Sequence, residues 1–289
     1  MRFASPMLLF LHPPFSMAEH APFRPKQSLG QNFMHDPNMI RKIVDALQAP
    51  PDAHVVEIGP GTGALTELLH ARYDTFTALE VDDRAVAYLN QELPAVDVRQ
   101  EDALNANWPA LAEEKGGPVY VISNTPYYLT SQLLFALVDA RSHVAEAVLT
   151  MQKEVAERLV ADPRTKAYGI LSVIMQLYAA PKHLFNISRH VFSPQPNVTS
   201  AAVRCVYDPA SAPEVDPKWL RTLVRAAFNQ RRKMLRNSLS PWSKDIGVSL
   251  PNDWGRRRAE ALAPEDFVEL ARSLDADSHA SASSPKLHE

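Results

Sequence analysis

Strand-like and helix-like segments alternate between residues 37 and 161 of this 289-residue chain, and this alternation constrains its fold more than any other feature. The strand-like stretches are rich in β-branched residues, and apolar residues recur at helical spacing between them. These stretches are 53–61, 75–82, 96–102, 118–124 and 146–152. Such alternation predicts parallel strands joined by right-handed crossovers. We therefore expect an α/β fold with a Rossmann-like, doubly wound, mostly parallel sheet.

The pattern changes near Pro209, beyond which only helical periodicity remains, so a small all-helical C-terminal domain is expected. The N-terminal apolar run, 7–11, is stopped by Pro13 and Pro14 and is too short for a signal peptide, with Met17 a candidate start. The predicted divisions are a disordered extension at 1–22, a main domain at 23–208, a helical domain at 209–275 and a disordered tail at 276–289.

The composition, 46% apolar and 22% charged, is that of a soluble globular protein. A single cysteine, Cys205, excludes an internal disulfide and a multi-cysteine metal site, and the histidines lack metal-ligand spacing. We expect no metal, no membrane span, a cytoplasmic location and a monomer. The net charge of −3 means that any nucleic-acid surface must be a local patch.

Glycines follow the first strand of the alternating region, in "EIGPGTGAL". Gly59, Gly61 and Gly63 allow a tight turn and a close approach of backbone N–H groups to a ligand. Their spacing is not the G-x-G-x-x-G of dinucleotide sites, and no Lys-Ser/Thr pair follows as in a P-loop. Taken alone, this turn favours a ligand site only weakly, because a connection that binds nothing can have the same glycines.

Acidic residues end the next two strands. Glu80 lies where a carboxylate accepts hydrogen bonds from ribose hydroxyls, and Asp102 could accept one from an exocyclic adenine amine or simply cap a helix. Ligands of open α/β sheets bind beyond the carboxyl ends of the strands. A nucleoside cofactor without a pyrophosphate fits these residues.

Several stretches resemble known enzymes. "EIGPGTGALT", "ALEVD", "QEDAL" and "NTPYYLTSQLL" resemble class I S-adenosylmethionine-dependent methyltransferases. "QSLGQNFMHD", "MQKEVAERLVADPRTKAYGILSV", "VFSPQPNVTSAAV" and "AAFNQRRKMLRNSL" are similar, in the same order, to the 16S ribosomal RNA adenine dimethyltransferases of the KsgA/RsmA type. The resemblance implies N6,N6-dimethylation of two adjacent adenosines in a hairpin near the 3′ end of 16S ribosomal RNA, within an immature small subunit. It implies cofactor contacts from Asn32, Met34, Gly59, Gly61, Glu80, Asp102 and Asn124.

The segment "NTPY" then has a chemical role. The lone pair of an adenine amine is delocalised, so methyl transfer requires acceptors that hold the nitrogen toward sp³ geometry. We assign these to the Asn124 side-chain oxygen and the Thr125 backbone carbonyl. Pro126 restricts the turn, and Tyr127 offers a stacking face for the flipped base. The resemblance places Phe192 on the other face of that base, although a buried core role is also open.

The run 221–236 contains six basic residues and no acid. As one helix it would present an arginine stripe beside an apolar stripe, which suits phosphate contacts. The candidate RNA-binding residues are Arg221, Arg225, Arg232, Lys233 and Arg236. A second candidate patch is Lys153, Arg158, Arg164 and Lys166.

Two alternatives stay open: a 23S ribosomal RNA adenine methyltransferase, and a ribosome assembly factor whose binding matters more than its methylation. The chain also departs from the family at Thr125, where Leu is usual, and at Tyr128, where Asn is frequent.

Overall fold

The computed structural model describes residues 23–282 of the chain. A seven-stranded sheet lies at its centre, in the order β4-β3-β2-β5-β6-β9-β7. The strands β2, β3, β4, β5 and β6 pair in parallel, whereas β9 is antiparallel to both of its neighbours. The predicted doubly wound, mostly parallel sheet is thus confirmed. Its strands are β2 (His54–Ile58), β3 (Thr75–Glu80), β4 (Asp97–Gln100), β5 (Val119–Ser123), β6 (Val144–Gln152), β7 (Lys182–Ile187) and β9 (Ser200–Val206).

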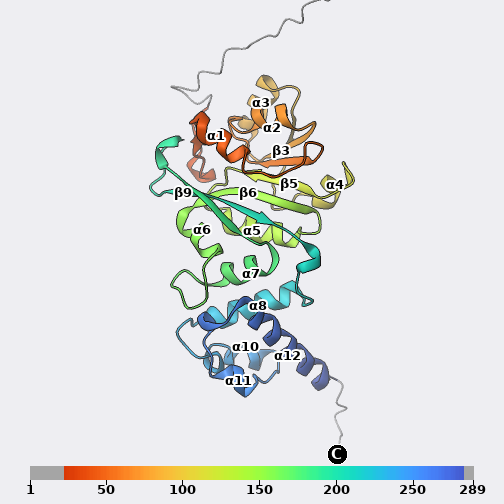
Figure 1. Ribbon diagram of the computed structural model, residues 1–289, viewed down its shortest axis with the longest axis vertical. Helices are drawn as coiled ribbons and strands as arrows, with labels where there is room; N and C mark the ends of the chain where they lie inside the picture. The colour runs from red at the N-terminus through yellow and green to blue at the C-terminus, as the bar shows by residue number, and fades with distance from the viewer. Residues whose placement is uncertain (1–22, 283–289) are drawn as a thin grey trace, which may run out of the picture.

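Helices cover both faces of the sheet (Figure 1). The first layer is α1 (Pro37–Val44), α2 (Thr66–Arg72) and α3 (Asp83–Glu92), and the second includes α5 (Thr130–Asp139), α6 (Lys153–Leu159) and α7 (Ile170–Tyr178). Successive side chains of a strand point to opposite faces of the sheet. Val55 packs with α1 and α2, and Val56 belongs to the core on the α5 side. The short helix α4 (Trp108–Glu113) precedes β5.

A two-stranded antiparallel ribbon joins segments far apart in the sequence. β1 (Phe33–Met34) pairs with β8 (Phe192–Ser193), so that Met34 lies opposite Phe192. The ribbon brings the residues before α1 and those before β9 to one end of the pocket described below.

The C-terminal part is helical, as predicted, and stacks beyond α7 (Figure 1). Its helices are α8 (Pro217–Phe228), α9 (Leu235–Ser238), α10 (Ser240–Asp245), α11 (Asn252–Gly255) and α12 (Pro264–Ala282). α12 continues past residue 276, where the tail was expected to begin. The expected disorder of 1–22 and of 283–289 lies outside the described residues.

The single helix expected over 221–236 is wrong. α8 ends at Phe228, a turn follows, and the short α9 begins at Leu235. Contacts distant in sequence impose this break: the Leu235 N–H donates to the Arg257 carbonyl over 2.8 Å, and Met234 forms an isolated bridge with Arg258. The arginine stripe of a continuous helix therefore does not form.

Candidate active site

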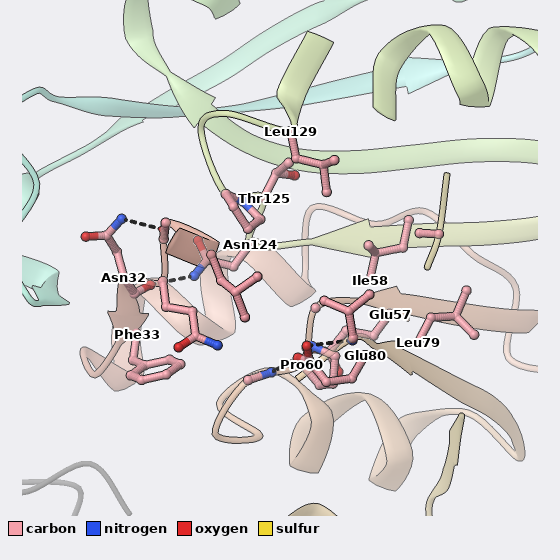
Figure 2. A pocket seen from close by; sticks show the side chains of 18 of the residues that line it. Asn32, Phe33, Glu57, Ile58, Pro60, Leu79, Glu80, Asn124, Thr125 and Leu129 are labelled. Atoms are coloured by element: carbon pink, nitrogen blue, oxygen red, sulfur yellow. Dashed lines mark hydrogen bonds between the residues drawn. The ribbon is translucent and has the colours of Figure 1, made fainter. Parts of the chain in front are cut away.

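A pocket opens at the carboxyl ends of β2, β3 and β5, where the chain order of the strands reverses direction. All the residues that are predicted to contact the cofactor or the target base line this one pocket: Asn32, Met34, Gly59, Gly61, Glu80, Asp102, Asn124, Thr125, Pro126, Tyr127 and Phe192. Figure 2 shows Asn32 and Asn124 on one side of it and Glu57 and Glu80 on the other. The sequence-predicted residues are therefore brought together, and their contacts with ligands stay predictions.

The glycine turn after β2 forms part of the pocket floor. Gly59 and Gly61 have φ angles of +68° and +58°, which residues with a Cβ rarely adopt. A Cβ on Gly61 would lie 3.0 Å from the Phe33 ring, so the ring rests directly on this turn. The turn therefore requires glycine for its conformation and, at Gly61, for its packing.

The Glu80 carboxylate is buried and held by backbone amides. It accepts hydrogen bonds from the N–H groups of Gly61, Val81 and Asp82 over 3.1, 2.8 and 2.9 Å. A carboxylate has about four lone-pair positions, so capacity remains for a ligand hydroxyl. Asp102 is exposed, and its side chain accepts from Leu104 N and from the Asn105 amide. Its side chain therefore caps the turn that follows it, at the rim of the pocket.

The Asn124 amide is fixed by two hydrogen bonds. Its Nδ2 donates to the Asn32 carbonyl over 3.0 Å, and its Oδ1 accepts from the Thr150 hydroxyl over 2.8 Å. An amide oxygen has two lone pairs, so Oδ1 keeps one acceptor position. Sequence reasoning missed Thr150, whose hydroxyl lies in the mostly apolar strand β6, and that was the available signal.

Thr125 is 3% exposed and its side-chain hydroxyl has no partner among residues 23–282. Within the same described part of the chain, no backbone N–H donates to its carbonyl oxygen. The backbone carbonyl at this position is therefore an acceptor without a donor.

Four aromatic residues line the pocket, and Tyr127 and Phe192 are the two predicted to contact the target base; the others are Phe33 and Tyr128. The Tyr127 hydroxyl lies 2.6 Å from the Ser200 Oγ, while burial raises the pKa of the phenol. Phe192 is 4% exposed and also packs in the core beside Met34. Phe192 therefore has the core role considered for it, and its place on one face of a target base stays a prediction.

The motif "EIGPGTGAL" also contains Glu57, to which the sequence assigned no role and which lines the pocket at the end of β2. Its Oε2 accepts from the Thr66 hydroxyl over 2.7 Å, and burial raises the pKa of the carboxyl to about 8. The nearby Glu80 charge adds to that rise. The signal was an acid within a buried strand, directly before the glycine turn.

The predicted RNA-binding residues fall into different places. Arg232 and Lys233 line a groove with Arg164 and Lys166, so parts of the two predicted patches meet in one basic groove. Lys153 and Arg158 do not line it and instead pair with Glu157 and Glu154 on α6. Arg221 instead forms an ion pair with Asp139, its side chain only 15% exposed, and both Arg221 and Arg225 lie over the Phe135 ring. Arg236 is exposed on α9, apart from that groove.

Within residues 23–282, no group of three or more histidine, cysteine or acidic side chains is arranged to bind a metal ion. None of the helices in that range has the length and apolar character needed to cross a membrane.

The sheet order, the glycine turn after β2 and the acid after β3 define a class I methyltransferase. A model of the ribosomal RNA adenine dimethylase family matches residues 23–274. The chain belongs to this family, as its sequence motifs predicted.

Relatives agree with that assignment. Over 256 residues the chain is 64% identical to ribosomal RNA small subunit methyltransferase A of Salinibacter ruber, covering 88% of this chain and 86% of that protein. It is 42% identical to the protein of the same name from Prosthecochloris aestuarii, covering 87% and 95%.

Solved structures share the fold. A dimethyladenosine transferase from Plasmodium falciparum superposes with a TM-score of 0.71 at 23% identity, covering 84% of this chain and 98% of that one. The 23S rRNA methyltransferase ErmE gives a TM-score of 0.61 at 25% identity, covering 84% and 100%.

Proposed function

We propose that this chain transfers methyl groups from S-adenosylmethionine to N6 of two adjacent adenosines in a hairpin near the 3′ end of 16S ribosomal RNA. Its substrate would be the RNA within an immature small subunit, and it would act as a monomer in the cytoplasm. The observation that carries the proposal is the fixed Asn124 amide, which shares one pocket with the Glu80 carboxylate and with aromatic rings that include Tyr127 and Phe192. The relatives named small subunit methyltransferase favour 16S over 23S RNA.

The pocket fits a nucleoside-bearing cofactor. Glu80 is held by three backbone N–H groups and can accept a further hydrogen bond from a ribose hydroxyl. Gly59 and Gly61 let the backbone approach the ligand closely. Asp102, at the rim, is free to accept from an adenine amine with the lone pairs that its local cap leaves. S-adenosylmethionine would supply the methyl group, activated by its sulfonium.

The protein's part in the chemistry is to orient the target amine. The remaining lone pair of Asn124 Oδ1 and the Thr125 carbonyl provide two acceptors for the two N–H groups of an adenine amine. Accepting from both groups favours the pyramidal nitrogen that attacks a methyl carbon. Tyr127 and Phe192 provide aromatic surface for the flipped base, worth roughly 1–3 kcal/mol per base. The amine proton can leave to water after transfer.

The basic groove is proposed to hold the RNA backbone. Arg232, Lys233, Arg164 and Lys166 line it, and the duplex parts of ribosomal RNA are recognised largely through shape and phosphates. Exposed Arg236 is a further candidate on α9. The Asp139 pair and the Phe135 contact give Arg221 and Arg225 a structural role that competes with phosphate binding.

The proposal is tested by mass spectrometry of small-subunit and 23S RNA after incubation of immature subunits and 50S precursors with the protein and isotopically labelled cofactor. We expect two dimethyladenosines in 16S RNA with the wild type and, with Asn124→Ala, a rate lower by about 10²-fold or more. Asn186→Ala, on the exposed face of β7, is the matched control. Label in 23S RNA alone, or no label in either RNA, would overturn the proposal.

A further inference from the structure

Residues 23–34 form a covering segment over the glycine turn and the Glu80 end of the pocket. Gly30, Gln31, Asn32 and Phe33 from this segment line the pocket. Phe33 rests against Gly61, as described above. The segment therefore lies where its position controls whether a cofactor can enter or leave the pocket.

The two ends of the covering segment are attached differently. Its C-terminal end belongs to the main fold through the pairing of Met34 with Phe192 and the bond from Asn124 to the Asn32 carbonyl. The rest of the segment is held by side chains of the loop after β3 and of α3, among them Asp82, Arg84 and Tyr88. The Asp82 carboxylate accepts from Lys26 Nζ and from Gln31 Nε2, each over 2.9 Å.

Asp82 is well placed for this task because its side chain is fully buried. Arg84 reinforces the arrangement: its Nη2 lies 2.6 Å from the Asp82 carboxylate, and its Nη1 donates to the Arg24 carbonyl over 3.0 Å. These donors hold the pKa of Asp82 well below its usual range, so the carboxylate stays charged. Charge-assisted hydrogen bonds of this kind are about twice as strong as neutral ones.

The same residue also touches the pocket floor. The Asp82 N–H donates to Glu80 Oε1 over 2.9 Å, so its backbone supports the proposed ribose acceptor while its side chain holds the cover. We propose that Asp82 is a positioning residue that keeps the covering segment closed over the cofactor and slows cofactor release. This inference rests on the proposed use of a nucleoside cofactor in this pocket, and it adds a residue whose side chain would act on the cofactor through Lys26 and Gln31.

The test compares Asp82→Asn with Asp83→Asn. Asparagine caps a helix as well as aspartate does, so the α3 N-cap survives the first change. Asp83 is the matched control because it also contacts Lys26 Nζ, but over a longer distance of 3.3 Å and with a side chain that is 73% exposed. The measurement is the dissociation rate of S-adenosylhomocysteine by stopped-flow competition. We expect a rise of about tenfold or more for Asp82→Asn and a rate near wild type for Asp83→Asn.

Two further readouts separate positioning from general destabilisation. Hydrogen exchange of the ligand-free protein should quicken at the Lys26 and Leu29 amides and stay unchanged at the Met34 amide. In steady state, KM for the cofactor should rise while KM for the RNA stays constant. Lys26→Met combined with Gln31→Met should reproduce the effect from the other side of the contact, whether or not Asp82→Asn folds well.

Equal release rates in Asp82→Asn and Asp83→Asn, or in the Lys26→Met, Gln31→Met double variant and the wild type, would overturn the inference and leave the proposed function intact. A wild-type protein that binds no S-adenosylhomocysteine would overturn the proposed cofactor and this inference together.

Discussion

At the scale of single residues, Thr125 combines a buried, unpartnered hydroxyl with a backbone carbonyl that is free to accept. Thr125→Val removes the hydroxyl and keeps the shape. We expect the free energy of unfolding to rise by about 1 kcal/mol, because a buried unsatisfied group costs about 1–3 kcal/mol. The methylation rate should stay near wild type, since the carbonyl remains. Urea unfolding and single-turnover methylation measure the two effects.

The control for that change is Thr66→Val. The Thr66 hydroxyl donates to the Glu57 carboxyl, so its loss should lower stability where the loss at Thr125 raises it. A fall in stability for both variants would contradict the expectation for Thr125.

Glu57 gives a pH dependence at the same scale. Its pKa is about 8 in the folded protein against an ordinary value of 4.5, because burial disfavours its charged form. Below pH 4.5 both the folded and the unfolded chain hold the proton, and the group has no effect. From there to about pH 8 the unfolded carboxyl ionises first, so its contribution to stability falls as the pH rises.

Glu57→Gln should therefore remove part of the decline in stability between about pH 5 and pH 8, the range between the pKa values of the unfolded and folded carboxyl. Urea unfolding at several pH values measures this slope. The exposed Glu67→Gln on α2 serves as the control and should keep the wild-type slope. Parallel slopes in all three proteins would show that the Glu57 pKa is not raised.

At the scale of elements, the turn between α8 and α9 decides which basic side chains face solvent. Arg231 turns back to donate to the carbonyls of Lys166 and Thr165 over 2.7 and 2.6 Å, leaving Arg232 and Lys233 in the groove. Arg232→Ala with Lys233→Ala should weaken RNA binding and reduce its salt slope by about 0.7–0.9 for each phosphate that the variant no longer neutralises.

The contrasting variant is Arg221→Ala in α8. Because Arg221 pairs with Asp139, its loss should lower stability and leave the salt slope unchanged. Filter binding between low and moderate salt distinguishes the two. An identical slope in the double variant and the wild type would remove the groove from the RNA surface.

The elements also show how far sequence reasoning reached. Strands such as β2 and β5 were predictable because β-branched runs end in turn-forming residues, a local property. The pocket followed, because the carboxyl ends of parallel strands meet at one edge. The break after Phe228 was not predictable, since it depends on contacts with Arg257 and with the loop at 165–166. The Asp82 contacts likewise join side chains that no local pattern connects.

At the scale of the whole molecule, the predicted boundary near residue 208 divides the chain but not its core. Tyr168, fully buried beside α7, donates its hydroxyl hydrogen to the Leu262 carbonyl over 2.8 Å and packs near Phe228. One apolar cluster runs from the sheet through α7 to α8 and α12. Scanning calorimetry should therefore show a single unfolding transition for the full chain.

A chain truncated after Asp208 should lack that cooperative transition, because the α7 surface would lose its apolar partners. A truncated chain that unfolds cooperatively near the wild-type melting temperature would show that the sheet domain is independent.

The β1–β8 ribbon has a thermodynamic consequence. Met34, in the covering segment, pairs with Phe192, which we propose lies beside the target base, so one displacement would alter the proposed sites of both ligands. Two ligands that favour the same arrangement of a shared element raise each other's affinity by the same factor. S-adenosylhomocysteine should therefore tighten the binding of a short adenosine-containing RNA, and that RNA should tighten S-adenosylhomocysteine equally. Calorimetric titration in both orders measures this reciprocity, and independent affinities would show that the ribbon transmits nothing.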